Sequence, residues 1–106
     1  MPKFLLRANY TPTGMKGLLT EGGTGRREAV AKMIADVGGT LESFYFALGE
    51  DDVFMIADVP DNVSTAALSM MVCASGSATT RTTVLMTPED MDRATGVHVD
   101  YRPPGR

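Results

Sequence analysis

Three side chains in this sequence have the chemistry needed for general acid–base catalysis. His98 is the only histidine, and an imidazole titrates near neutrality by default. Tyr45 lies in an aromatic stretch and Asp52 in an acidic turn, and either group can move a proton within hydrogen-bond reach of a substrate. His98 precedes a terminal Pro103-Pro104-Gly105 segment, where an exposed or subunit-bridging role is more common. The three residues form no recognisable catalytic signature.

Metal ligands and reactive thiols are few. With one histidine and one cysteine, the sequence lacks the ligand spacing of a zinc or haem site. The acidic run Glu50-Asp51-Asp52 is typical of a solvated hairpin turn rather than of a carboxylate metal site. Cys73 has no partner for an internal disulfide, and no charged segment followed by an apolar one opens the sequence. We therefore expect no metal, no cofactor and a cytoplasmic location.

Composition limits the classes of partner. The chain has 106 residues, 43% hydrophobic and 22% charged, with a net charge of −3, which is the composition of one globular domain. Its ten basic residues are scattered, so a nucleic-acid-binding surface is not expected. No apolar run is long enough to cross a bilayer. A folded chain of this mass should expose roughly 5,700 Å².

The first half of the chain predicts one strand and two helices. Residues 3–10 alternate, which predicts a strand with Phe4, Leu6, Ala8 and Tyr10 on one side and Lys3, Leu5, Arg7 and Asn9 on the other. A short helical segment follows from Thr13, and the glycines of residues 21–25 should end it. Residues 26–37 have helical spacing and are followed by Gly38-Gly39.

The second half predicts an antiparallel hairpin, a long helix, a fourth strand and a short helix. The hairpin strands are residues 40–48 and 53–59, and Asp61 is suited to cap the helix that follows. The predicted buried stripe of that helix is Val63, Ala66, Ala67, Met70, Met71 and Ala74. Residues 78–86 form a β-branched strand, and Thr87-Pro88 opens a helix that Gly96 closes.

The order of these elements predicts an α+β, ferredoxin-like βαββαβ domain at residues 1–96, with an extended arm at residues 97–106. Two helices cover only one face of the four-stranded antiparallel sheet. Both sides of the strands nevertheless carry large apolar residues, so we expect a second copy of the chain to cover the helix-free face, giving a homodimer or higher oligomer. In the arm, Val97, Val99 and Tyr101 alternate with polar residues, a pattern suited to pairing with an edge strand of the same sheet or a neighbour's.

A polar cluster on the helix-free face is the candidate ligand-binding site. Its expected members are Arg7, Asn9, Tyr45, Asp58 and Arg81. Arginine forms doubly hydrogen-bonded pairs with carboxylates, so this cluster suits a small organic anion. Alternatively, Arg7 and Arg81 pair with Asp58 or another acid across a subunit interface. The methionines at positions 33, 55, 70, 71, 86 and 91 should line the helix side of the core, as adaptable packing or as a pocket that changes shape.

Several short segments, in order and spacing, resemble the GYD family of small bacterial proteins over nearly the whole chain. They are Asn9-Tyr10-Thr11, Gly14, Gly38-Gly39, Phe44-Tyr45, Leu48-Gly49-Glu50 with Asp52, Arg81-Thr82 and Thr87-Pro88-Glu89. Gly49 and Asp52 fit the motif that gives the family its name, whereas Asp51 stands where the family has tyrosine. The resemblance implies a ferredoxin-like domain that assembles as a dimeric α/β barrel, and it implies no particular activity.

Two function classes follow. The chain is expected to be an oligomeric small-molecule-binding or assembly module. The alternative is a cofactor-independent oxygenase or isomerase of the dimeric α/β barrel type, with His98, Asp52 or Tyr45 as acid or base; that alternative rests on fold-level analogy.

Overall fold

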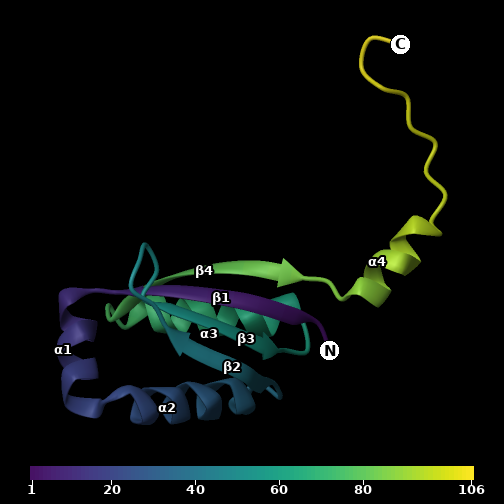
Figure 1. Ribbon diagram of the computed structural model, residues 1–106. Coiled ribbons are helices and arrows are strands. Elements are labelled where there is room, and N and C mark those ends of the chain that lie inside the picture. The colour runs from purple at the N-terminus through teal and green to yellow at the C-terminus, as the bar shows by residue number, and fades with distance from the viewer.

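The computed structural model describes all 106 residues as one four-stranded antiparallel sheet with four helices (Figure 1). In chain order the elements are β1 (Lys3–Tyr10), α1 (Pro12–Glu21), α2 (Gly23–Asp36), β2 (Thr40–Phe46), β3 (Val53–Asp58), α3 (Asn62–Ala74), β4 (Ala78–Leu85) and α4 (Pro88–Thr95). The strand order is β2-β3-β1-β4, consistent with the ferredoxin-like arrangement. All four predicted strands are confirmed. No helix in the structure has the length and apolar character of a membrane span.

The predicted break between the first two helices is shorter than expected. Gly22 alone makes it, with a φ of 83° that favours glycine, and its N–H donates to Leu18 O at 2.8 Å. Gly23 to Gly25 then form the first turn of α2, which the sequence placed only from Arg26. The stop after α2 is confirmed, since Gly38 has a φ of 82°.

Helix α3 begins where predicted, but its buried side was predicted wrongly. The Asp61 carboxylate accepts from Ser64 N–H at 2.8 Å and caps the helix. Thr65 and Leu68 are its buried residues. The stripe expected to be buried faces outward, with Val63 79% and Met70 68% exposed. The cause is that α3 carries apolar residues on more than one side, so periodicity alone does not select the packed one.

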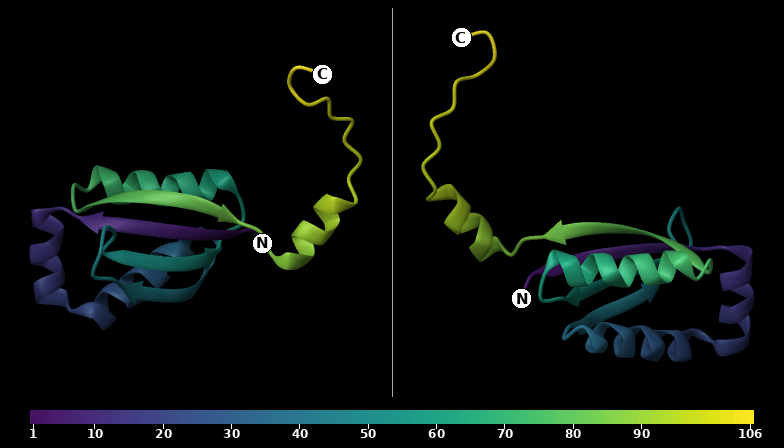
Figure 2. Two further views of the ribbon diagram at one scale, coloured as in Figure 1. Left: turned by 45° about the horizontal axis from the view of Figure 1, so that its top comes forward. Right: turned by 180° about the vertical axis from the view of Figure 1, so that it is seen from behind.

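The two long helices cover one face of the sheet side by side, with α2 over β2 and α3 over β4 (Figures 1 and 2). Beneath them, the main apolar core consists of Phe4, Val30, Ile34, Ala57, Val59 and Leu68. Gly39 packs so closely here that a Cβ would lie 2.6 Å from Asp58 O. The opposite face of the sheet carries no helix (Figure 2).

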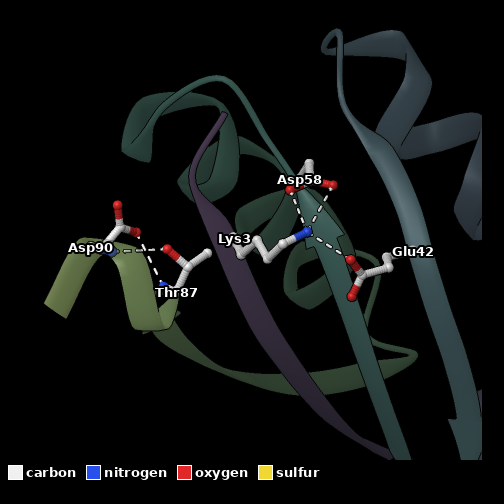
Figure 3. Close-up of polar contacts among 5 residues, drawn as sticks. All are labelled: Lys3, Glu42, Asp58, Thr87 and Asp90. Atoms are coloured by element: carbon white, nitrogen blue, oxygen red, sulfur yellow. Dashed lines mark hydrogen bonds and ion pairs between the residues drawn. The ribbon is translucent and has the colours of Figure 1, made fainter. Parts of the chain in front are cut away.

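Helix α4 and residues 97–106 extend away from the sheet in every view (Figures 1 and 2). The Thr87 hydroxyl accepts from Asp90 N–H at 3.0 Å, and the Asp90 carboxylate accepts from Thr87 N–H at 3.1 Å, which closes a capping box (Figure 3). The arm forms no strand, so its predicted pairing with its own sheet is wrong. The Cα radius of gyration is 17.0 Å, against about 13 Å for a compact chain of this length.

Candidate functional site

The helix-free face of the sheet brings the predicted polar residues onto one surface. Strand register places Tyr45 beside Phe54, Phe54 beside Arg7, and Arg7 beside Arg81, so these four residues form a row across all four strands. Asn9 lies one step further along β1 on the same face. Exposure along the row differs: Tyr45 is 69% and Phe54 is 37% exposed. The prediction that these residues share the helix-free face is confirmed.

Asp51 is the residue that organises this end of the face. Although it lies in the β2–β3 connection, only 5% of it is exposed. Its carboxylate accepts a hydrogen bond from Arg81 Nη2, and lies 3.8 Å from Arg7 Nη1 and 3.4 Å from Asn9 Nδ2. The hydrogen bond to Asp51 raises the pKa of Arg81. The expectation that the acidic run is simply solvated is therefore wrong for Asp51.

Asp58 was expected near the arginines, but it lies at the other end of the face. Its carboxylate accepts from Lys3 Nζ at 3.0 Å, and Glu42 accepts from the same amine at 2.6 Å (Figure 3). Glu42 reaches Lys3 because β2 has a register irregularity between Leu41 and Ser43. Hydrogen bonds to Glu42 and then Asp58 raise the pKa of Lys3.

The two ends of the helix-free face differ in their balance of cations and carboxylates. One end carries the guanidinium groups of Arg7 and Arg81, which pair with the buried Asp51 carboxylate, while the Glu50 carboxylate acts on Arg81 without forming an ion pair. The other end, at Lys3, carries one cation and two carboxylates, a net charge of −1. Between these ends lies a row built of Ser43, Ile56, Leu5 and Thr83.

A cavity of about 270 Å³ lies on the opposite, helix-covered side of the sheet. It is bounded by β1, β3 and β4 below and by α2 and α3 at its sides, and 13 of its 20 lining residues are hydrophobic. The cavity extends past the packed core toward the end of the sheet where β1 finishes and β4 starts. Leu6, Met33, Phe44 and Met55 pack against the core and also line the cavity.

Arg7 borders the cavity from β1, but strand alternation turns its side chain to the helix-free face. The other polar side chains of the cavity fall into two sets. On the α3 and β4 side, hydroxyls satisfy one another: Ser69 bonds to Thr80, and Ser75 bonds to Ser77. At the end of β1, Tyr10 and Arg26 line the cavity, and no hydrogen bond joins either side chain to the rest of the chain. Burial raises the pKa of Tyr10, while Arg26 lowers it and Glu21 and Asp52 raise it further. The Tyr10 phenol is therefore a neutral hydrogen-bond donor at neutral pH.

The three candidate acid–base residues do not come together. Asp52 accepts from Tyr10 N–H at 2.9 Å through its carboxylate, and its own N–H donates to Ala8 O at 2.9 Å, so it ties the hairpin to β1. Tyr45 lies on the helix-free face of β2. His98 lies in the arm beyond α4.

Sequence reasoning missed Tyr10 and Arg26 as cavity residues. Tyr10 was placed correctly on the helix side, but nothing in the sequence showed that the helices leave a cavity there. The methionines carried part of the signal, since Met33, Met55 and Met71 line the cavity. The expectation of core packing fails for the methionines at positions 70, 71, 86 and 91, whose exposed fractions are 68%, 70%, 54% and 52%, although Met71 also borders the cavity.

Comparison with known proteins identifies the family. The sequence profile of the GYD domain matches residues 4–95, which covers all the strands and helices described above except Lys3, the first residue of β1. The chain therefore belongs to the GYD domain family. Neither the curated proteins nor the solved structures yielded a match.

Proposed function

We propose that this GYD-domain protein is a small-molecule-binding subunit whose ligand occupies the cavity between the sheet and helices α2 and α3. The observation that carries the proposal is the cavity itself, about 270 Å³ in volume and mostly apolar in lining. Protein interiors normally contain few voids larger than a water molecule. A largely apolar concavity with a few polar groups is the usual form of a ligand site.

The lining also supports a site that adapts to its occupant. Met33, Met55 and Met71 contribute flexible, polarisable side chains from α2, β3 and α3. The two long helices pack on opposite edge strands, β2 and β4. A small change in the distance between them would therefore alter the cavity while each helix keeps its own strand contacts.

Binding is tested by titrating the full chain with toluene, an uncharged apolar probe, and monitoring the titration by NMR. Val72 lines the cavity from α3, so Val72→Phe should fill part of it and weaken toluene binding at least about tenfold, or ~1.4 kcal/mol. Val63→Phe is the matched control, because Val63 lies on the outward side of the same helix and is 79% exposed. No toluene binding to the unmodified protein, or equal loss in both variants, would contradict the proposal.

The helix-free face favours a second role for this subunit, self-association as a dimeric α/β barrel. Two copies stacked sheet to sheet, with a twofold axis along the Leu5 row, bring the arginine end of each face against the Lys3 end of the other, where Glu42 and Asp58 outnumber the single cation. Exposed aromatic side chains on this face support the role, since Tyr45 is 69% and Phe54 is 37% exposed. A standard interface buries about 800 Å² on each partner. The cytoplasm is the location that we propose for the protein. Native mass spectrometry in a reducing buffer should therefore show an even-numbered oligomer. A monomer at every concentration would contradict this role.

The enzymatic alternative, an oxygenase or isomerase, receives no support from the arrangement of its proposed residues. An acid or base must lie within hydrogen-bond reach of the reacting atoms in a site that excludes water. His98, Tyr45 and Asp52 occupy the arm, the helix-free face and the hairpin connection, and none of them lines the cavity.

A further inference from the structure

The cavity has one polar end, and its donors lack acceptors within the chain. Tyr10 approaches from the end of β1 and Arg26 from the early turns of α2. Arg26 Nε is shielded from solvent and makes no hydrogen bond. Its nearest charged partner is Glu21 Oε2, 3.4 Å from Nε, in a half-exposed ion pair. Such exposed ion pairs contribute little to stability. The Tyr10 hydroxyl and the Arg26 guanidinium therefore both have hydrogen-bond donors to offer an incoming group.

Charge at this end distinguishes among possible head groups. Three charged groups act on the Tyr10 phenol. Arg26 is a cation, whereas Glu21, which pairs with Arg26, and Asp52 are anions, so the local charge is negative by one. A ligand carboxylate here would add a third negative charge to a partly buried region, which is costly without a further cation. A ligand ammonium would lie beside the like charge of Arg26, with the Glu21 carboxylate already engaged by that guanidinium. An uncharged acceptor avoids both costs.

From this geometry we propose that the cavity takes an uncharged amphipathic molecule with a carbonyl oxygen as its head group. The oxygen accepts hydrogen bonds from the Tyr10 hydroxyl and the Arg26 guanidinium, and the apolar part lies along Val30, Met33 and Leu68. This rests on the proposed function, because it assumes that the cavity binds a small molecule, and it adds the chemical class. The volume of about 270 Å³ equals roughly nine water molecules at about 30 Å³ each, which suits a medium-length ketone, ester or amide.

Three probes of equal carbon-chain length separate the head groups: 2-octanone, octanoate and octylammonium, each titrated at pH 7 by calorimetry. The ketone should bind at least about tenfold more tightly than either ion. Toluene, which has no polar head, reports on the cavity independently. If toluene binds and octanoate binds as tightly as the ketone or more so, the neutral-acceptor assignment is overturned while the cavity site stands. If toluene does not bind, the proposed function fails as well.

Substitutions then assign the head-group contacts. Tyr10→Phe and Arg26→Gln should each weaken 2-octanone binding by about threefold to tenfold, the range expected for one lost hydrogen bond. Toluene binding should stay within twofold of the unmodified protein, which a merely structural loss would not produce. Tyr101→Phe in the arm and Arg27→Gln on the exposed side of α2 are the matched controls. Equal weakening of ketone and toluene in the cavity variants would overturn the assigned contacts.

Discussion

Asp51 and Arg81 should respond unequally to substitution, although each removes the same ion pair. Asp51 is 5% exposed, whereas the Arg81 side chain is 53% exposed. Without Asp51, both arginines regain solvent. Without Arg81, a nearly buried carboxylate keeps only Asn9 at 3.4 Å and Arg7 at 3.8 Å. Burial of an uncompensated charge is the larger cost, so Arg81→Gln should destabilise the fold more than Asp51→Asn.

The magnitudes follow from these partners. Asp51→Asn keeps an oxygen that can accept from Arg81, so the lost charge assistance should cost about 1 kcal/mol of unfolding free energy. Removing one partner of a fully buried pair costs about 3–5 kcal/mol. Because Arg7 remains near it, the nearly buried Asp51 carboxylate that Arg81→Gln leaves behind should cost roughly 2–4 kcal/mol, a penalty that belongs to this carboxylate and not to the half-exposed guanidinium. The double variant has no buried charge left and should cost about 1 kcal/mol.

The assay is urea unfolding followed by far-UV circular dichroism, because the chain has no tryptophan. All variants are compared at one protein concentration, since any self-association makes apparent stability depend on concentration. Arg27→Gln, an exposed substitution on α2, should stay within about 0.5 kcal/mol of the unmodified protein.

The decisive comparison is Arg81→Gln with and without Asp51→Asn. Adding the second substitution should raise the stability of the first by about 1–3 kcal/mol, the amount assigned above to the stranded carboxylate. Equal, additive losses would refute the reasoning, because they would show that Asp51 reaches solvent or another partner once Arg81 is gone.

Three further outcomes are expected. Gly17→Ala in α1 should stabilise the fold by about 0.5–1 kcal/mol, because a Cβ there meets no other atom. Gly14→Ala should cost about 3 kcal/mol, because its Cβ would lie 1.9 Å from the backbone oxygen of Ser77. Urea unfolding of both variants checks that the two changes in stability have opposite signs. Glu42→Lys should raise the dimer dissociation constant at least about tenfold, because it makes the net charge at the Lys3 end of the helix-free face positive. The control Glu28→Lys makes the same charge change on an exposed position of α2 and should leave this constant, measured by analytical ultracentrifugation, unaltered. Deleting residues 97–106 should weaken the oligomer, and unchanged mass and melting temperature would refute a role for the arm.

The strands could be read from the sequence, and a period of two fixes which residues of one strand share a side, but the face that β2 turns to the helices was settled only by its register with β3. That is why Arg7, Asn9, Tyr45 and Arg81 share a face as expected. Helix α3 shows the limit of the same reasoning. Its sequence offers apolar residues around most of its circumference, so the packed side depends on where the sheet lies. The actual choice buries Thr65 and Leu68 instead of the predicted stripe.

The polar site shows a second limit, because ion pairing depends on a loop whose path no periodicity describes. One of the two alternatives for Arg7 and Arg81 was pairing with Asp58 or another acid across a subunit interface. Register then put Asp58 opposite Lys3, at the far end of β1 from Arg81. The acid that reaches the arginines is Asp51 of the same chain, from the hairpin connection, at the position where the resemblance to the GYD family implies a tyrosine. The only sequence signal for Asp51 was that it stands where the resemblance implies a tyrosine. This signal did not indicate which cation the Asp51 carboxylate would pair with.

The two faces of the sheet make different demands on an occupant, and β1 connects them. Arg7 projects toward the helix-free face and Tyr10 toward the cavity, a few residues apart on one strand. The hairpin that carries Asp51 beneath Arg81 also carries Asp52, whose carboxylate holds the Tyr10 backbone. Asp51 thus pairs with Arg81 on the helix-free face, and Asp52 holds the backbone of Tyr10, whose phenol lies at the polar end of the cavity on the other face. A change of Asp51 that shifts this turn would therefore reach the cavity through Asp52, without passing through the hydrophobic core.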